Sequence, residues 1–438
     1  MRYLPMGQST NSRSRNRSRR RTLATTGSLV AGLAALTALA ALPAGASTPG
    51  WTGEALISVH ATGDGWEPAI AADPSAPYVY AAWMQYIGAK VQIQYKVSAN
   101  GGATWGNAGP ICPSCGSKQG QYDVTLATSS SGEIFATWMQ GNNISFADST
   151  SHGATWSAPR TISAGVWADK PWLTVSSTGQ DIYVAWSTHG NVQITDSHNG
   201  GSTFSTPQQF TAESGIYYYP NGGTVLPNGT ALFAASEYPE KGNNTKLTGP
   251  IPIVVFRTAD GGTTWQRTVA DTLNTGATFA TSSVTTITSD AAGKLLLLYS
   301  GSTSVGANGK VYIRTSADSG ATWSAATEMT TSAGGADATS VAAFGKASGQ
   351  FVITWMDKRT GAWNVWERQS SDGGATWTAD ALASDATSGA SYKTAAGFGL
   401  PYGDYDMVTI NSAGRAVAIM GEGDANQVHG DIWVNSQT

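Results

Sequence analysis

One octapeptide pattern recurs six times along this chain and limits its fold more than any other feature. The clearest copy, SSDGGATW, runs from Ser370 to Trp377, and the shared pattern is Ser/Thr-x-Asp-x-Gly-x-Thr-aromatic. Successive copies lie about 50 to 60 residues apart and end at Trp105, Trp156, Phe204, Trp265, Trp323 and Trp377. Repeats of this length are typical of propellers and other arrays of similar units.

The chemistry of the octapeptide explains why it recurs. The side chain of Asp372 can accept hydrogen bonds from nearby backbone N–H groups, as in an Asx turn. Gly374 can adopt the positive φ that closes a hairpin, and Trp377 then begins a strand with a large apolar side chain. The other copies carry Asp, Asn or Ser at the acceptor position: Asp260, Asp318, Asn100, Asn199 and Ser151. We therefore predict a structural turn and not a catalytic site.

Each octapeptide belongs to a larger unit of four strands. A strand ending at a Gly hairpin comes first, a strongly β-rich run follows, and a third strand leads into the octapeptide. The chain contains seven β-rich runs: Tyr78–Gln85, Glu133–Gln140, Ile182–Thr188, Thr230–Glu237, Lys294–Ser300, Gln350–Asp357 and Arg415–Glu422. We predict an all-β fold, in which residues 47–438 form one seven-bladed β-propeller with no second domain.

The last unit has no octapeptide and therefore lacks a fourth strand. The apolar and β-branched stretch Glu54–Val59 precedes the first unit and has no other partner there. We predict that it becomes the outermost strand of the last blade, beside Asp431–Asn435, and closes the ring. Closure would cover a sheet edge that otherwise invites aggregation.

The octapeptide matches the Asp box, or BNR repeat, of sialidases and other Asp-box propellers. The stretches Trp355–Gly361 (WMDKRTG) and Tyr402–Tyr405 (YGDY) also resemble secreted bacterial Asp-box proteins that carry a sialidase-like label. The resemblance covers nearly the whole chain beyond residue 46 and implies a propeller associated with glycans. Sialidases, however, have six blades, and function depends on the site and not on the fold.

The residues that a sialidase requires are not all present. The resemblance implies three arginines that clamp a substrate carboxylate, a Tyr nucleophile with a Glu partner, and an Asp acid/base. Here Glu67 stands where the first arginine is expected, and Arg359 is the one arginine predicted on the site face. The sequence therefore argues against a typical exo-sialidase.

Blade geometry predicts which face carries the site. With the strands of a blade named A to D from the centre outward, octapeptides join C to D and Gly hairpins join A to B on one face. The B–C loops and D–A crossovers lie on the opposite face, where ligands favour loops on a rigid scaffold. We call this the site face.

The carboxylates and aromatic rings of the site face suit sugar chemistry and stacking. The candidate catalytic residues are Glu67, Asp123, Asp169, Asp404 and Tyr405, and the candidate binding residues are Trp66, Tyr122, Trp172, Tyr218, Glu237, Asp357 and Arg359.

Each candidate also has a structural interpretation. Trp66 and Trp172 can pack between blades, Asp357 and Arg359 can pair locally, and the Asp residues can cap turns. Two functional hypotheses remain open. One is a secreted glycoside hydrolase-type enzyme or polysaccharide lyase, and the other is a non-catalytic propeller that binds glycan, cell wall or protein.

Residues 1–46 read as an export signal. A basic region with Arg19-Arg20-Arg21 is followed by an apolar stretch and the small-residue site Ala44-Gly45-Ala46. The double arginine resembles a twin-arginine signal, and an ordinary secretory signal is the alternative. All 29 acidic residues lie beyond residue 46, but seven of the 25 Lys and Arg residues lie before it, so the processed chain has a net charge of about −11. We expect an extracellular monomer that binds a glycan or polysaccharide, and neither nucleic acid nor membrane.

The two cysteines, Cys112 and Cys115, are separated by two residues. A redox motif lacks the βαβ context, and a zinc site lacks two further ligands nearby. We predict a local disulfide, which suits a secreted protein. No metal site and no cofactor are predicted. Ca²⁺ held by Asp residues around the channel is the alternative, although no loop has the spacing of a calcium motif.

Overall fold

The structure is a computed structural model that describes residues 50–58, 63–115, 119–163, 167–188, 190–211, 216–239, 248–275, 285–361, 363–384, 406–422 and 430–438. The chain divides into two units, Met1–Pro43 and Ala44–Thr438, and all described residues belong to the second. The predicted signal segment and the candidates Asp404 and Tyr405 lie outside the described residues. Within the described ranges, no helix has the length and apolar character needed to cross a membrane.

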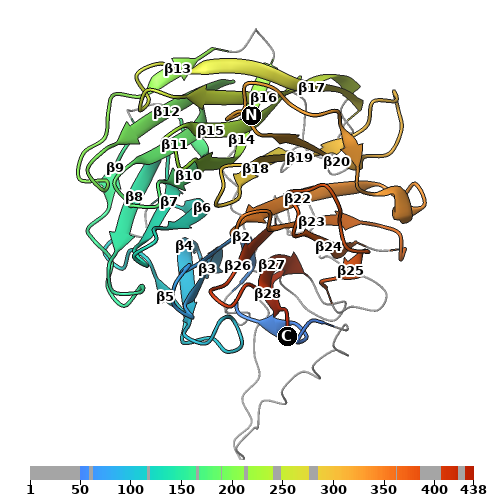
Figure 1. Cartoon of the computed structure of the whole chain (residues 1–438). Helices are drawn as coiled ribbons and strands as arrows, with labels where there is room; N and C mark the ends of the chain where they lie inside the picture. The colour runs from blue at the N-terminus through green and yellow to red at the C-terminus, as the bar shows by residue number, and fades with distance from the viewer. Residues whose placement is uncertain are drawn as a thin grey trace, which may run out of the picture. The chain divides into compact units, whose positions relative to one another are not determined.

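The second unit is a seven-bladed β-propeller of four-stranded antiparallel sheets, as predicted (Figure 1). Blade 1 contains β2 (Gly65–Ala72), β3 (Val79–Ile87), β4 (Lys90–Ser98) and β5 (Gly109–Pro110). Blade 2 contains β6 (Gln121–Thr128), β7 (Ile134–Gln140), β8 (Asn143–Ser149) and β9 (Arg160–Thr161). Blade 3 contains β10 (Asp169–Val175), β11 (Ile182–Thr188), β12 (Asn191–Ser197) and β13 (Gln208–Phe210). Blade 4 contains β14 (Ile216–Val225), β15 (Ala231–Pro239), β16 (Thr248–Thr258) and β17 (Gln266–Thr275).

The remaining blades follow the same order. Blade 5 contains β18 (Thr285–Ser289), β19 (Leu295–Gly301), β20 (Lys310–Ser316) and β21 (Thr327–Glu328), and a short 3₁₀ turn, η2 (Thr331–Ala333), comes after it. Blade 6 contains β22 (Ala338–Gly345), β23 (Phe351–Asp357), β24 (Asn364–Ser370) and β25 (Ala381–Leu382). Blade 7 contains β26 (Met407–Ile410), β27 (Ala416–Glu422), β28 (Asp431–Ser436) and β1 (Ala55–Leu56).

The second strands hold the core because their side chains on both faces pack against neighbouring blades. Trp83, Trp138, Trp186 and Trp355 occupy corresponding positions on β3, β7, β11 and β23 and are fully buried. Three of these indoles donate Nε1–H to a polar side chain two residues further along the same strand. The continuous apolar character of the β-rich runs therefore reflects burial on both faces.

The octapeptides form the predicted turns. Oδ1 of Asp372 accepts hydrogen bonds from the backbone N–H groups of Ala375 (3.0 Å) and Thr376 (2.9 Å), and Oδ2 accepts one from the Thr376 hydroxyl at 2.6 Å. These bonds lower the pKa of Asp372 to about 2. Gly374 has φ 84°, in the left-handed region. The Asp side chain is thus fully occupied in shaping its own turn.

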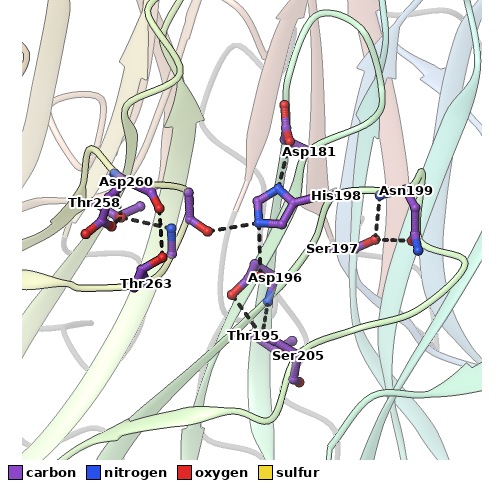
Figure 2. Close-up of polar contacts among 12 residues, drawn as sticks. Asp181, Thr195, Asp196, Ser197, His198, Asn199, Ser205, Thr258, Asp260 and Thr263 are labelled. Atoms are coloured by element: carbon purple, nitrogen blue, oxygen red, sulfur yellow. Dashed lines mark hydrogen bonds and ion pairs between the residues drawn. The ribbon is translucent and has the colours of Figure 1, made fainter.

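A histidine links the octapeptide turns of blades 3 and 4 (Figure 2). Nδ1 of His198 lies 2.8 Å from Oδ1 of Asp181, and Nε2 lies 2.9 Å from the carbonyl oxygen of Gly261 and 3.3 Å from Oδ2 of Asp196. Because both ring nitrogens face acceptors, both carry a proton in this arrangement. The hydrogen bond to Asp181 accordingly raises the pKa of His198. This cluster holds two blades together on the face opposite the candidate site.

The N-terminal strand closes the ring as predicted. β1 pairs antiparallel with β28, with Ala55 opposite Val434 and Leu56 opposite Trp433 (Figure 1). The strand is shorter than the predicted Glu54–Val59, because only two residues form the ladder. Trp51 extends the contact through a bridge to Gln437 and is 2% exposed.

The predicted disulfide joins Cys112 and Cys115 in the segment between β5 and β6. Cys112 is buried, and Cys115 packs against the same apolar cluster. The bridge therefore anchors the crossover that leads from blade 1 into blade 2.

A carboxyl group lies in the seam between blades 6 and 7. Glu367 on β24 is 2% exposed and lies on the same face of the strand as Val365. Val365 packs in an apolar cluster with Val408 of blade 7 and Trp51 of the N-terminal segment. Among the described contacts, Oε1 of Glu367 accepts no hydrogen bond. Burial raises the pKa of Glu367 to about 7, and a hydrogen bond from Gln369 opposes this shift in part.

We predict that Glu367→Gln removes a pH-dependent loss of stability. In the native protein the carboxyl group stays protonated up to about pH 7, whereas the unfolded chain ionises it near 4.5. Its protonated form therefore stabilises the fold fully below pH 4.5, and this stability is lost as pH rises to about 7. The loss amounts to about 3 kcal/mol, because the pKa is raised from 4.5 to about 7.

Thermal unfolding of the native chain and the variant between pH 4 and 8.5 measures this effect. We expect similar stability near pH 4 and a more stable variant above pH 7. The control is Glu328→Gln, a partly exposed carboxylate paired with Lys310. Parallel pH curves for the native chain and Glu367→Gln would contradict the prediction.

Candidate functional site

Three charged side chains meet where the first strands of blades 1 to 3 begin, on the site face. Nζ of Lys170 on β10 donates to Oε1 of Glu67 on β2 at 3.3 Å and to Oδ1 of Asp123 on β6. Oε2 of Glu67 accepts a hydrogen bond of 2.9 Å from the backbone N–H of Asp123. The exposed fractions of Glu67, Asp123 and Lys170 are 4%, 3% and 9%. We call these residues the central triad.

A β-bulge positions each member of the triad. The ladders of β2, β6 and β10 shift register at this point, and Glu67, Asp123 and Lys170 have φ values of 54°, 52° and 52°. β22 has the same irregularity, with Ser340 at φ 49°. Because the bulge recurs with four different side chains, its left-handed backbone belongs to the blade and does not by itself indicate catalysis. The four blades differ in the side chain at the bulge, which is Glu67, Asp123, Lys170 or Ser340.

Aromatic side chains surround the central triad. Trp66 contacts Tyr86 edge to face with ring centroids 5.5 Å apart. Burial, followed by the charges of Glu67 and Asp123, raises the pKa of Tyr122. The pKa of Tyr86 is also raised, first by burial and then by Tyr122, Glu67 and Asp64. Both phenols therefore remain protonated at neutral pH and can donate hydrogen bonds.

The third and fourth blades complete the rim. Asp169, directly before Lys170, is half-buried and accepts a hydrogen bond of 3.2 Å from the hydroxyl of Tyr217. Nζ of Lys170 lies 5.9 Å from the centre of the Tyr219 ring, within cation–π range. Of the sequence-predicted candidates, Glu67 and Asp123 thus contact the ammonium group, Tyr122 lies near both carboxylates, and Trp66 and Asp169 are the chain neighbours of Glu67 and Lys170.

A cavity of about 240 Å³ lies among the first strands of all seven blades. Trp172 of β10, Asn221 of β14 and Asp406 beside β26 line it, with apolar and hydroxyl side chains of the other first strands. Trp172 is half-buried and also packs against the clusters of neighbouring blades, as its structural interpretation predicted. It therefore connects the rim to the central channel.

The remaining described candidates lie apart from the triad in their contacts. Nε of Arg267 donates to Oε1 of Glu237 at 2.8 Å and to the hydroxyl of Tyr218 at 3.1 Å, all within blade 4. Burial and the hydrogen bond to Glu237 raise the pKa of Tyr218 to about 12. This group binds the strands of one blade to each other.

Arg359 is held within blade 6. Its guanidinium pairs with Asp357 and Asp380 and lies 3.9 Å from the centre of the Trp366 ring. The local pairing of Asp357 with Arg359 agrees with the structural interpretation of the sequence. These two carboxylates already occupy the donors that a substrate carboxylate would need.

Lys170 received no role from the sequence, although a signal for it exists. Asp123, Lys170 and Ser340 each lie nine residues before a hairpin glycine: Gly132, Gly179 and Gly349. Equal spacing in repeated blades places these residues at corresponding positions around the channel. Aligning the units on their hairpins would therefore have placed the lysine at the position that corresponds to Asp123.

The described residues contain no group of three or more His, Cys, Asp or Glu side chains arranged to hold a metal ion. The central triad offers a pair of carboxylates and one ammonium group, and the nearby Tyr86 and Tyr122 offer phenol donors.

No protein-family model and no curated protein matches this sequence. Among solved structures, a Dyadobacter fermentans protein of unknown function superposes with a TM-score of 0.51 at 12% identity, over 89% of this chain and 99% of that one. A Hadza microbial sialidase gives a TM-score of 0.44 at 13% identity, over 86% of this chain and 66% of the sialidase. An ulvan lyase gives 0.48 at 11% identity, over 85% of this chain and 94% of the lyase. The chain thus spans about two thirds of that sialidase, and these likenesses concern the propeller fold.

Proposed function

We propose that this protein acts on glycans at its site face, as a glycoside hydrolase-type enzyme distinct from exo-sialidases. The observation that carries the proposal is the convergence of Glu67 and Asp123, from successive blades, on one ammonium group inside a rim of aromatic side chains. Paired carboxylates provide the acid, base or nucleophile of glycoside hydrolysis, and aromatic rings stack on sugar faces.

The spacing of the two carboxylates supports one type of hydrolysis. Both lie within hydrogen-bonding distance of the same Nζ, so their bonded oxygens are at most about 6 Å apart. The two carboxyl groups lie about 5–5.5 Å apart in retaining enzymes and about 6.5–9.5 Å apart in inverting enzymes, so this spacing agrees better with a retaining enzyme. Lys170 holds the two carboxylates side by side, which suits a nucleophile or the stabilisation of an oxocarbenium-like state. The protonated phenol of Tyr122 is the neighbouring group that can donate to a glycosidic oxygen.

The arginine contacts argue against sialidase chemistry. Glu67 occupies the position where the family resemblance implies the first arginine, and Arg359 is bound to Asp357 and Asp380. Among the described residues around the triad, Lys170 is the cation, and it already contacts two carboxylates. A carboxylate-bearing sugar would therefore meet repulsion at the centre of the site.

A non-catalytic glycan-binding propeller is the second candidate, and one observation favours it. Lys170 holds both carboxylates in fixed positions, and all three side chains are nearly buried. Such a group can accept sugar hydroxyl hydrogen bonds without transferring a proton. Turnover is the property that separates the two candidates.

We also propose that the protein is exported and meets its glycan outside the cell. The basic and apolar composition of residues 1–46 supports this, as does the acidic character of the rest of the chain. Fractionation of the producing bacterium tests the proposal, with the processed chain expected outside the cytoplasm. A full-length chain confined to the cytoplasm would contradict it.

We predict that Glu67→Gln and Asp123→Asn each lower kcat at least about 100-fold, because each removes a charged group of the reacting pair. Purified protein is first screened on plant, microbial and sialylated glycans for released products. Glu133→Gln is the matched control, since Glu133 lies beside the hairpin on the opposite face and should leave turnover unchanged. Glycan binding without product would favour the binding propeller. Neither binding nor turnover on any glycan would overturn the proposal.

A further inference from the structure

We infer that the central channel holds a second ligand site, for one small neutral molecule with several hydroxyl groups, such as a single sugar unit or a polyol. The site is the cavity of about 240 Å³ among the first strands of the blades. Glu67, Asp123 and Lys170 are not among the residues that line it, so the inference goes beyond the proposed function. Its basis is a group of three buried polar side chains that the rest of the described protein leaves without hydrogen bonds.

Asn221 on β14 is the most polar of the three. The residue is 3% exposed, and its carboxamide makes no hydrogen bond within the described part of the chain. Both amide atoms nevertheless border open space, and for a residue this buried that space is the cavity that it lines. A carboxamide offers two N–H donors and an acceptor oxygen. Burying such a group is costly unless water or a ligand satisfies it.

Two threonines flank Asn221 on the neighbouring blades and line the same cavity. Thr174 on β10 is 5% exposed and Thr286 on β18 is 4% exposed. Among the described contacts neither hydroxyl group has a hydrogen-bond partner, and both border open space. Gly222 brings β14 directly against blade 5, since a Cβ there would lie 2.4 Å from Oγ1 of Thr286. The three polar groups therefore belong to consecutive blades, 3 to 5, on one side of the channel.

The other hydroxyl groups of the lining residues already have partners. Oγ1 of Thr128 donates to the carbonyl oxygen of Ala72 at 2.8 Å. Oγ1 of Thr224 lies 2.7 Å from Oγ of Ser289, and Oγ1 of Thr288 accepts a backbone N–H of blade 6 at 3.1 Å. Each of these bonds joins two neighbouring blades and stabilises the ring. The groups that remain available for a ligand are thus confined to the wall that blades 3 to 5 form.

The composition of the wall indicates the chemistry of the ligand. Carboxamide and hydroxyl groups both donate and accept hydrogen bonds, and the hydroxyl groups of a ligand do the same. Asp406 is the one charged side chain among the lining residues, and it has interactions of its own. The half-buried indole of Trp172 adds a flat apolar surface of the kind that packs against a sugar ring. A neutral molecule with several hydroxyl groups therefore fits this wall better than an ion.

The volume limits the ligand to one unit. A cavity of about 240 Å³ is smaller than the pockets of about 300–1,000 Å³ that hold drug-sized ligands. It corresponds to the liquid volume of about eight water molecules. A single pyranose or a cyclic polyol suits this space, whereas an oligosaccharide chain does not. Ordered water is the alternative occupant that a test has to exclude.

Saturation-transfer NMR and titration calorimetry with glucose, galactose and myo-inositol test the inference, with glucuronate and glucosamine as charged counterparts. We expect at least one neutral probe to bind with a stoichiometry of one, and more tightly than the charged sugars. Asn221→Leu keeps a similar size and removes the carboxamide, so the affinity should fall at least about tenfold. Thr128→Val is the matched control in the same cavity. Its hydroxyl group is already bonded to Ala72, so the affinity should not change.

Two further measurements decide how a loss of binding is interpreted. Asn221→Leu should unfold at the temperature of the native chain or above it, because the carboxamide has no partner within the described protein. Glu67→Gln should bind the probe as the native chain does, because the cavity is separate from the central triad. Loss of binding in Glu67→Gln would place the sugar at the triad, which overturns this inference and supports the proposed function. Absence of binding for every probe, or equal binding by Asn221→Leu and the native chain, also overturns it and leaves water as the occupant of the channel.

Discussion

Replacing Lys170 with methionine is expected to lower the free energy of unfolding at neutral pH by about 3–5 kcal/mol, as loss of one partner from a buried ion pair does. Methionine has a similar length and keeps most of the packing, so the main change is the loss of charge. Glu67 and Asp123 would then be two nearly buried carboxylates without their shared ammonium group. Burial and mutual repulsion would raise their pKa values above the unfolded ones.

The sign of the pH dependence follows from that shift. Groups whose folded pKa is raised stabilise the protein below the unfolded pKa, and this stability is lost as pH rises through the folded value. The penalty of Lys170→Met should therefore be small near pH 4 and reach its full size above neutrality. Adding Glu67→Gln should restore part of the lost stability, because one of the two repelling charges is removed.

Chemical denaturation at pH 4 and pH 7.5 measures these differences. Lys310→Met is the matched control, since Lys310 pairs with Glu328 on the surface, where such pairs contribute about 0–1 kcal/mol. Lys170→Arg keeps the charge and should recover much of the stability. If Lys170→Met loses no more than the control, or loses equally at both pH values, the triad does not act as a buried charge group.

The fold could be predicted because its information is repeated. The six octapeptides all specify the same turn, and the seven β-rich runs all specify the same kind of strand. A wrong prediction for one unit would therefore conflict with the predictions for the others. The structure of the octapeptide can be predicted from its sequence because its hydrogen bonds are local. The Asp372 side chain accepts hydrogen bonds from the backbone N–H groups three and four residues further along. Ring closure followed from a strand count, although the ladder has only two residues where six were expected.

The site could be predicted only in part, because its geometry depends on how blades pack around the channel. Glu67 and Asp123 were selected for their types and crossover positions, and the structure brings both to Lys170. The contacts of Arg359 and Glu237 depend on strand pairing within blades 6 and 4, which no single stretch of sequence specifies.

Glu367 is a residue whose burial could not be predicted from the sequence. It lies on β24 between Trp366 and Arg368, and this stretch has no regular alternation of apolar and polar residues that would predict its burial. The neighbouring blade and the N-terminal segment cover that face instead, which makes Glu367 one of the buried carboxyl groups. Burial between blades is a property of the closed ring and not of the strand.

Deletion of residues 47–60 is expected to destabilise the ring by more than any single substitution proposed above. It removes β1, the Trp51 side chain and the hydrogen bond of 2.6 Å from Ser58 to Asp431. Loss of a buried tryptophan alone costs about 3–5 kcal/mol. The removed segment also covers β28, so its deletion would expose the edge of the last blade to other chains.

A lower unfolding temperature and concentration-dependent aggregation would follow, measured by calorimetry and light scattering. A synthetic peptide of residues 47–60 should restore stability when added to the truncated protein, because β1 joins blade 7 through its own ladder and through Trp51. The same peptide with Trp51→Ala is the matched control and should restore less. Val305→Ala, at a side chain that is 79% exposed, should leave the full chain unchanged. A truncated protein as stable and monomeric as the full chain would show that the ring closes without its N-terminal strand.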